Sequence, residues 1–283
     1  MPSALSTDLY ELTMAAGYDA AGERPRASFE LFVRELPPTR GYLVAAGLQQ
    51  VVEFLESWAC SPDEIAYLRG LPDLGGVRRK FFDECLPQLR FTGDVWAVPE
   101  GIPVFAGEPM VRVTAPLPEA QLVETALLAT MLFQTSIASK AARVVAAAGG
   151  RSVVEFGGRR AHGTEAAMLA ARAACLGGCR ATSNLEAGFR FGVPVSGTMA
   201  HSWVMAHVDE LTAFRRYTEV HGRRSVLLID TYDPLVATRR IVEAKLQPHA
   251  VRLDSGDLEY LSRSVRAILD AGGLGQTQIL ASG

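Results

Sequence analysis

The chain has 283 residues, 48% of them hydrophobic and 21% charged, so it is long enough to bury the core of one large or two modest domains. Its formal net charge of −3 argues against a nucleic-acid-binding protein, which normally carries a basic surface. The four cysteines lack the spacing of a disulfide framework or a zinc knuckle, which indicates reduced thiols in a cytoplasmic protein.

The first part of the chain predicts an α+β domain over residues 1–116. The opening stretch "MPSALSTDLYELTM" has no basic leader of the kind that begins a signal peptide. A helix is expected to follow, because Asp8 and Glu11 have the spacing of a capping box, apolar residues recur at helical spacing, and Gly17 can end it. Alternating segments at 27–36 and 91–116, punctuated by glycine and proline, then predict an antiparallel sheet.

A long apolar helix is expected over 118–149. Gln134, Ser136, Ser139 and Lys140 interrupt its apolar character, whereas a membrane span needs about 20 predominantly apolar residues. The sequence therefore predicts a buried helix and no membrane segment.

The remaining residues alternate between short apolar strands and helices, with the helices expected at 163–177, 206–221, 234–247 and 257–271. This order predicts a parallel sheet, and no Gly-x-Gly-x-x-Gly follows any strand, which favours a (β/α) barrel over a dinucleotide-binding sheet. We assign residues 117–283 to this barrel. The chain ends directly after a strand, so the barrel is expected to be incomplete at the carboxyl terminus.

Polar residues follow several of these strands, at the end where barrel enzymes carry their active sites. In "AVRLD", Arg252 and Asp254 share one face of the strand, either as a structural ion pair or as ligand-binding groups. Asp230, Asp254 and Asp257 could supply oxygen ligands to Mg²⁺, although Asp257 could equally cap the next helix.

Two other segments leave their role open when they are considered alone. In "EFGGRRAHG", Arg159 and Arg160 follow two glycines, which suits an anion site but also an exposed loop. In "VSGTMAHSWV", His201 lies behind small and hydroxyl-bearing residues, and a lone histidine is more often structural than catalytic.

Taken together, several segments resemble the nicotinate phosphoribosyltransferase family in order and spacing, from about residue 6 to the end of the chain. They are "TDLYELTMAAGY", "RGYLVAAGL", "EFGGRRAHG", "ATSN", "GTMAHSW" and "VRLDSGDL". The resemblance implies the type II phosphoribosyltransferase fold, an α+β domain followed by an irregular (β/α) barrel. It also implies an enzyme of NAD biosynthesis that joins nicotinate to 5-phosphoribosyl 1-pyrophosphate, releasing nicotinate mononucleotide and pyrophosphate while ATP is hydrolysed.

The same resemblance implies roles for individual residues. His201 matches the histidine that ATP phosphorylates, and Asp254 is the second catalytic candidate. In relatives that prefer nicotinamide an aspartate stands at the position of Ser183, so the neutral serine favours nicotinate. The expected nicotinate contacts are Tyr10, which would stack on the pyridine ring, Thr198, Arg252 and Ser183. The expected phosphate contacts are Arg159, Arg160, Ser255 and Asp257, and the metal candidates are Asp230 and Asp254.

Further expectations concern the cofactor and the assembly. Mg²⁺ is the expected cofactor, with ATP as co-substrate. The family places the amino-terminal domain of one subunit over the barrel of another, so a cytoplasmic homodimer with Tyr10 acting in trans is expected.

Members of the family continue beyond the position of Gly283 with further barrel strands and a glycine-rich phosphate loop, so the chain is expected to lack the carboxyl-terminal part. Two alternatives follow. One is a truncated, non-catalytic paralogue that binds nicotinate or a partner. This alternative would be favoured if no second chain from the same genome supplied the phosphate loop. The other is a related nicotinamide or quinolinate phosphoribosyltransferase, but quinolinate enzymes lack "GTMAHS" and need more basic residues for a second carboxylate.

Overall fold

The computed structural model describes residues 3–283, which divide into two compact units. The first unit ends at Val195 and the second begins at Ser196, and each is described by itself. The first unit contains the predicted α+β elements and also the first strands of the expected barrel. The expected domain boundary at residue 116/117 stays a prediction.

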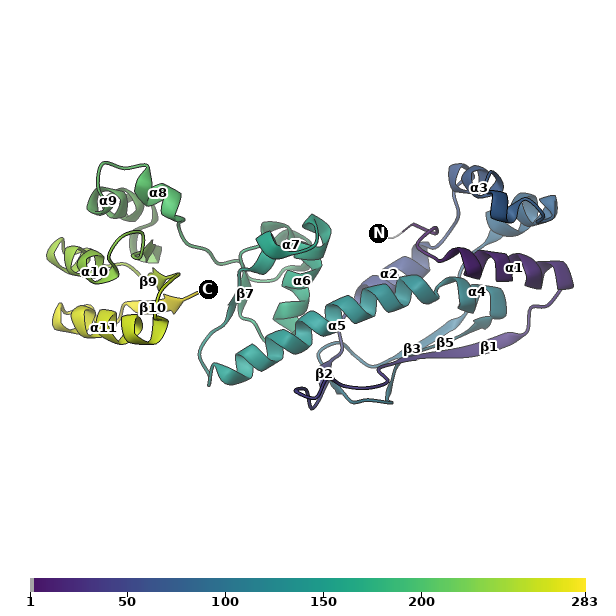
Figure 1. The fold of residues 1–283 in the computed structure, drawn as a ribbon, viewed down its shortest axis with the longest axis horizontal. Helices are drawn as coiled ribbons and strands as arrows, with labels where there is room; N and C mark the ends of the chain where they lie inside the picture. Colours follow the sequence, from purple (N-terminus) through teal and green to yellow (C-terminus); the bar gives the residue numbers. More distant parts are fainter. Residues whose placement is uncertain (1–2) are drawn as a thin grey trace. The chain divides into compact units, whose positions relative to one another are not determined.

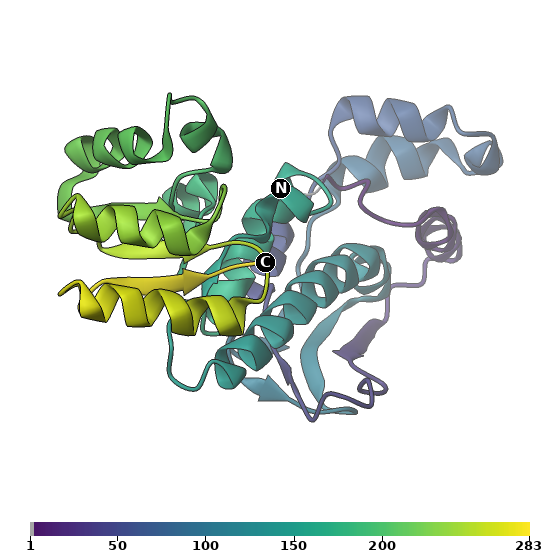
Figure 2. The same cartoon turned by 60° about the vertical axis from the view of Figure 1, so that its left-hand side comes forward.

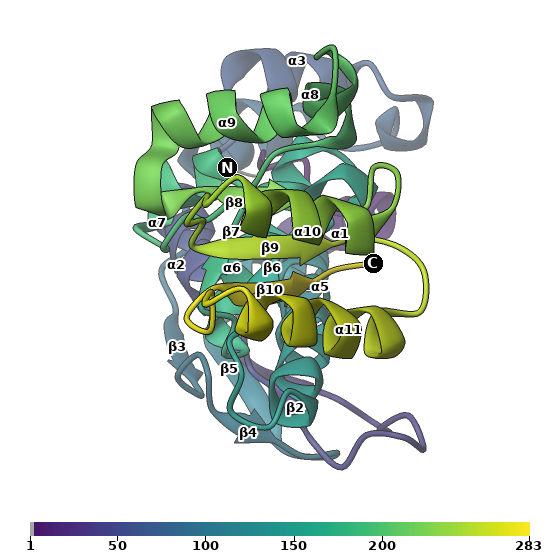
Figure 3. The same ribbon diagram turned by 90° about the vertical axis from the view of Figure 1, so that its left-hand side faces the viewer.

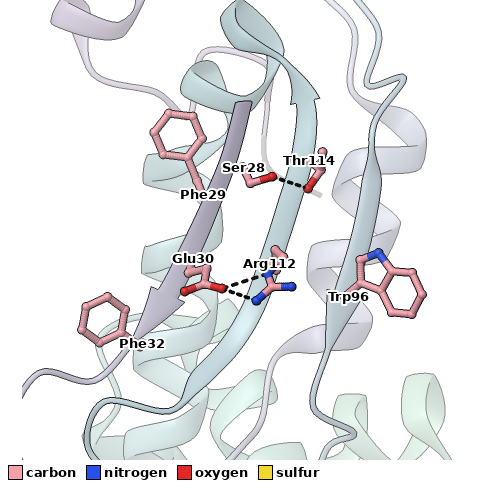
Figure 4. A pocket seen from close by; sticks show the side chains of 7 residues that line it. All are labelled: Ser28, Phe29, Glu30, Phe32, Trp96, Arg112 and Thr114. Carbon is pink, nitrogen blue, oxygen red and sulfur yellow. Dashed lines mark hydrogen bonds and ion pairs between the residues drawn. The ribbon is translucent and has the colours of Figure 1, made fainter. Parts of the chain in front are cut away.

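The first unit contains the predicted antiparallel sheet, in the order β1-β5-β3. The strands are β1 (Arg26–Phe32), β3 (Asp94–Ala97) and β5 (Pro109–Pro116). One face is covered by helix α4 (Leu117–Leu122), which packs on β1 and β5 (Figures 1 and 2). The other face carries a Glu30–Arg112 ion pair and the exposed Trp96 (Figure 4). This division follows from the period of two in a strand, since alternate side chains face opposite sides.

Helices and a small second sheet complete the amino-terminal part of this unit. The second sheet pairs β2 (Leu43–Val44) with β4 (Pro103–Val104) in antiparallel fashion. The helices are α1 (Leu9–Ala21), α2 (Leu48–Ser57) and α3 (Pro62–Arg69), followed by the short turns η1 (Pro72–Leu74), η2 (Phe81–Cys85) and η3 (Leu86–Gln88). Their apolar faces meet in one buried core that includes Phe54, Trp58 and Phe81.

Two details of the first helix differ from the prediction. Helix α1 runs through Gly17 and ends at Gly22, whose φ of 69° lies in the left-handed region that glycine adopts easily. Asp8 is the N-cap residue, but its side chain caps no backbone amide. Instead, the Thr125 hydroxyl lies within hydrogen-bond distance of Asp8 and of Glu11, so a contact from a distant helix replaces the predicted capping box.

The predicted long helix is present as α4 and α5 (Glu124–Ala147), with a short interruption at Val123. Ser139 and Thr135 are buried where α5 meets the β2 segment, and their hydroxyls accept hydrogen bonds from the backbone amides of Val44 and Ala46. The segment Leu117–Ala147 is long and apolar enough to cross a membrane, but half of its apolar window is buried inside the structure. Such a helix is weak support for a membrane span, since core helices pass the same test.

The carboxyl-terminal part of the first unit contains a short parallel pair of strands. β6 (Val154–Glu155) pairs with β7 (Ala181–Thr182), and Thr182 forms a further parallel bridge with Val195. The connecting elements are η4 (Gly157–Arg160), α6 (Thr164–Leu176) and α7 (Leu185–Phe191). Helix α6 connects the two parallel strands, as predicted for the helix at 163–177, and it packs against α5.

The second unit is a parallel sheet in the order β10-β9-β8 with helices packed on it (Figure 3). Its elements are α8 (His201–Met205), α9 (Glu210–His221), η5 (Gly222–Arg224), β8 (Val226–Leu228), α10 (Pro234–Glu243), β9 (Ala250–Leu253), α11 (Leu258–Ala271) and β10 (Gln278–Ala281). The single helix predicted at 206–221 is wrong at its start, because Asp209 caps a new helix by accepting a hydrogen bond from the Thr212 amide.

Candidate functional site

The carboxyl ends of β8, β9 and β10 bring several of the predicted site residues together in the second unit. Val251 and Leu253 on β9 are fully buried in the apolar core of this unit, so Arg252 between them faces the other way. This alternation confirms the predicted placement of Arg252 and Asp254 on one face.

Asp230, directly after β8, connects two of these strand ends. Its Oδ2 accepts hydrogen bonds of 2.7 Å from the Asp254 backbone amide and of 2.7 Å from the Ser255 hydroxyl. Its Oδ1 is buried and has no hydrogen-bond partner within residues 3–283. Asp230 therefore fixes the loop after β9 and keeps one buried acceptor oxygen without a donor.

Arg252 is held from three sides. Its Nε donates to the Ser282 hydroxyl at 2.8 Å, one terminal N–H donates to the Met199 carbonyl at 3.4 Å, and the other forms an ion pair with Asp254 Oδ1. Partial burial alone would raise the pKa of Asp254, but the hydrogen bond from Ser282 and the neighbouring Arg252 charge lower it below its ordinary value. Asp254 is therefore an ionised carboxylate at neutral pH.

His201 is the first residue of α8, and its ring lies between a hydroxyl and this carboxylate. Nδ1 is 3.2 Å from Thr231 Oγ1, and Nε2 is 3.6 Å from Asp254 Oδ2. The side chain is 40% exposed, so it is open to a ligand while two neighbours orient it. An ionised carboxylate beside Nε2 favours the tautomer that carries the proton there.

Two predicted residues of this unit lie outside the cluster. The Thr198 hydroxyl donates to the Val226 carbonyl at 3.1 Å, where β8 begins. Asp257 is the N-cap of α11, and its carboxylate accepts a hydrogen bond of 3.0 Å from the Tyr260 amide. The capping alternative for Asp257 is thus the one that the structure supports.

The other predicted residues belong to the first unit. Arg159 and Arg160 end the η4 turn after β6 and are exposed, and no ion pair to either guanidinium occurs in the described part of the chain. Ser183 directly follows β7, and its backbone amide donates to the Glu155 carbonyl at 3.0 Å. These residues therefore lie at the carboxyl ends of two paired parallel strands.

Tyr10 lies on α1, and 48% of its surface is exposed. Its hydroxyl donates to Glu11 at 3.3 Å. Desolvation and the negative charges of Glu124 and Glu11 raise the pKa of Tyr10 to about 12. The ring is thus an exposed, neutral phenol that can stack on a flat ligand.

Sequence reasoning missed three residues that hold the predicted ones in place: Thr231, Ser282 and Glu155. Thr231 contacts His201, Ser282 contacts both Arg252 and Asp254, and Glu155 contacts the η4 turn. Each lies at the end of a strand or within three residues after it, and this position is the signal in the sequence that could have identified them.

Two hollows of the first unit do not coincide with these residues. One, of about 630 Å³, lies on the open sheet face and is lined by residues such as Glu30, Trp96 and Arg112 (Figure 4). The other, of about 500 Å³, lies among α2, α5, α6 and α7 and is lined by residues such as Gln50 and Phe191. The hydrogen-bonded strand ends, and neither of these two hollows, identify the candidate site.

Comparison with known proteins gives matches over most of the chain. The model of the nicotinate phosphoribosyltransferase N-terminal domain matches residues 5–132, and the model of the nicotinate phosphoribosyltransferase family matches residues 151–268. The chain is 50% identical over 288 residues to nicotinate phosphoribosyltransferase pncB2 of Mycobacterium tuberculosis, covering 99% of this chain and 60% of that protein. It is 45% identical over 286 residues to nicotinate phosphoribosyltransferase of Bacillus subtilis, covering 98% of this chain and 57% of that protein.

A solved structure of the same family also matches the chain. The fold matches human nicotinic acid phosphoribosyltransferase with a TM-score of 0.86 and 30% identity, covering 97% of this chain and 67% of the human chain. The chain spans about 60% of the length of the bacterial relatives that it matches.

Proposed function

Because the chain belongs to the nicotinate phosphoribosyltransferase family and has its type II fold, we propose that it takes part in the family's reaction in NAD biosynthesis. In that reaction nicotinate and 5-phosphoribosyl 1-pyrophosphate give nicotinate mononucleotide and pyrophosphate, with ATP as co-substrate. The observation that carries the proposal is the position of His201 between Thr231 and the Asp254 carboxylate at the strand ends.

His201 is proposed to accept a phosphoryl group from ATP. The Asp254 carboxylate beside Nε2 favours the proton on that nitrogen, so Nδ1 keeps the lone pair, next to the Thr231 hydroxyl. Nδ1 would attack the γ-phosphorus of ATP, and the bond from that phosphorus to the β-phosphate oxygen would break, so that ADP leaves. Asp254 also stabilises the positive charge that the ring gains during the transfer. Asp254 acts in this proposal by orienting the histidine, without becoming protonated itself.

Arg252 is proposed to bind the carboxylate of nicotinate. A guanidinium fork matches a carboxylate in geometry and charge. Contacts to Ser282 and Asp254 fix the orientation of this fork, while the 3.4 Å contact to the Met199 carbonyl is long and easily exchanged for a ligand oxygen. Tyr10, Thr198 and a neutral Ser183 would complete the pyridine site.

The phosphate groups of the substrate are assigned to Arg159, Arg160 and Ser255, and Asp257 remains a further candidate although its carboxylate caps α11. Mg²⁺ fits the strand ends through Asp230, whose buried Oδ1 has no donor among residues 3–283, and through Asp254. No group of three or more histidine, cysteine or acidic ligands occurs there, which suits an ion that takes its other ligands from water and phosphate. When bound, the ion would offset the charge of the phosphate groups.

The proposed enzyme is a cytoplasmic homodimer in which Tyr10 serves the strand ends of the partner subunit. The resemblance to the family supports this assembly, and the exposure of Tyr10 on α1 is compatible with it.

The proposal is tested by incubating the purified chain with nicotinate, 5-phosphoribosyl 1-pyrophosphate, ATP and Mg²⁺ and measuring nicotinate mononucleotide. His201→Ala should lower the rate about tenfold or more and abolish ³²P transfer from ATP to the protein. His207→Ala is the matched control, because His207 lies in the same segment and its side chain contacts only Trp203 among the described hydrogen bonds and ring contacts.

Parallel assays with nicotinamide and quinolinate decide between the alternatives. If the folded parent chain prefers nicotinamide or quinolinate, that compound and not nicotinate is the substrate. A folded parent chain that binds nicotinate but forms no product would be the non-catalytic paralogue.

A further inference from the structure

The carboxylate of Glu155 joins the ends of β6 and β7 in the first unit. Its Oε2 accepts a hydrogen bond of 2.7 Å from the Thr182 hydroxyl, and its Oε1 accepts one from the backbone amide of Gly157. The Glu155 carbonyl accepts a third, of 3.0 Å, from the Ser183 amide. One residue therefore contacts both the turn that carries the arginine pair and the segment that carries Ser183.

Gly157 permits the closest of these contacts. A Cβ atom at this position would lie 2.9 Å from Glu155 Oε1, closer than real Cβ atoms approach. Any side chain would therefore push the carboxylate away from the amide that it accepts from. Gly157 thus leaves room for the carboxylate, and a larger residue would have to displace the flexible end of the Glu155 side chain.

The contacts continue from Thr182 into the next helix. Thr182 is fully buried, and its hydroxyl oxygen accepts a hydrogen bond of 3.0 Å from the Asn184 amide. Asn184 in turn caps α7 by accepting from the Ala187 amide at 2.9 Å. The Glu155 carboxylate thus orders a continuous path from η4 to the start of α7.

The arginine pair needs such a support. Arg159 and Arg160 are exposed, and no ion pair in the described chain holds either of them. Two mobile guanidinium groups lose conformational entropy when they bind an anion, so a fixed backbone beneath them lowers the cost of binding.

We propose that Glu155 is the positioning residue that holds the Gly157–Arg160 turn and Ser183 in register for the phosphate groups and the pyridine ring of the substrates. This inference rests on the proposed function, because that function makes the two loops substrate-binding. Glu155 does not contact the reacting atoms in this account, and it acts through the two loops.

The first test is Glu155→Gln, which keeps the shape but replaces one acceptor oxygen with an N–H₂ group. That group cannot accept from Gly157 or Thr182, so at least one of the two contacts loses its carboxylate acceptor, and at Thr182 the hydroxyl would have to accept instead of donate. We expect the KM for 5-phosphoribosyl 1-pyrophosphate to rise about tenfold with a smaller change in kcat, and Glu155→Asp to recover part of the loss. Glu165→Gln is the matched control, because it removes the same charge from an exposed position on α6.

A second variant separates the two loops. Thr182→Val keeps the buried shape but removes the hydroxyl that links Glu155 to the Ser183 segment. We expect it to reduce the preference for nicotinate over nicotinamide more than it raises the KM for the phosphoribosyl substrate.

Two readouts that do not need turnover separate this inference from the proposed function. The dissociation constant of inorganic pyrophosphate, measured by calorimetry, should rise about tenfold in Glu155→Gln, and amide hydrogen exchange at 157–160 should become faster. A parent chain that binds pyrophosphate but makes no nicotinate mononucleotide would overturn the function alone. A folded Glu155→Gln protein with the parent's pyrophosphate affinity would overturn the inference, whatever its exchange rates.

Discussion

At Glu210, the first residue of α9, a carboxylate is 2% exposed and, among residues 3–283, forms an ion pair with Arg240. The nearest nitrogen of Arg240 is 3.7 Å away, and Glu210 Oε1 has no hydrogen-bond partner among residues 3–283. Burial raises the pKa of Glu210 from 4.5 to about 7, since Arg240 opposes the shift only in part. The folded state therefore binds this proton more tightly than the unfolded state does.

The sign of the pH effect follows. The stabilising contribution of the protonated carboxyl is complete below the ordinary pKa of 4.5 and is lost as the pH rises through about 7. The Glu210→Gln side chain cannot ionise. When the pH is raised from about 5.5 to about 8, the free energy of unfolding of this variant should therefore fall by about 2 kcal/mol less than that of the parent chain. Urea unfolding at both pH values measures the difference. Glu219→Gln, at an exposed position of the same helix, should leave the parent's pH dependence unchanged.

At the scale of elements, a buried ion pair joins α6 to the loop between β3 and β4. The Arg172 side chain is 9% exposed and lies 2.6 Å from Glu100, and it also donates to Gln49 on α2 at 2.7 Å. Glu100 accepts from the Gly47 amide at 2.6 Å. Removal of the arginine therefore leaves the Glu100 carboxylate, whose side chain is only 16% exposed, without its counter-charge.

We expect Arg172→Ala to lower the free energy of unfolding by about 3 kcal/mol or more. The double variant Arg172→Met with Glu100→Gln should recover part of that loss, since neither partner then leaves a buried charge. Arg263→Ala should change stability by about 0.5 kcal/mol or less, because the Arg263–Glu259 pair is 79% and 77% exposed. If Arg172→Ala and the double variant lose the same free energy of unfolding, the unpaired charge of Glu100 does not cause the loss.

The close packing of α5 on α6 gives a further prediction. A Cβ atom at Gly177 would lie 2.3 Å from the Ala138 carbonyl oxygen, and backbone atoms cannot move aside cheaply. Gly177→Ala should therefore cost about 2 kcal/mol in a thermal or urea unfolding measurement. Gly192→Ala tests the opposite case of strain without a clash, since nothing lies within 4 Å of a Cβ there but φ is +66°.

The elements of the chain differ in how far their sequence predicts them. The sequence predicts β9 and the face on which each of its side chains lies, because apolar and charged side chains alternate in "AVRLD". The capping box at Asp8 was predicted wrongly, because Thr125, far along the chain, takes up the carboxylate. The hydroxyls of Thr231 and Ser282 could not be assigned to partners, since their roles depend on strand order, which spacing alone does not give.

At the scale of the whole molecule, the candidate site residues are distributed over both units. Tyr10 and the arginine pair belong to the first, while His201 and Arg252 belong to the second. Each unit has its own apolar core, so both sets of residues have a rigid support of their own. In the proposed homodimer Tyr10 is supplied by the partner subunit.

Complementation between inactive chains tests this arrangement directly. Tyr10→Ala and His201→Ala should each lose most of their activity as homodimers. In a mixed dimer with sites shared in trans, one site carries both substitutions and the other carries none. Random reassociation after mild denaturation should therefore restore about one quarter of the parent activity. Native mass spectrometry confirms that mixed dimers form, and mixed dimers without restored activity would mean that Tyr10 and His201 serve a site within one chain.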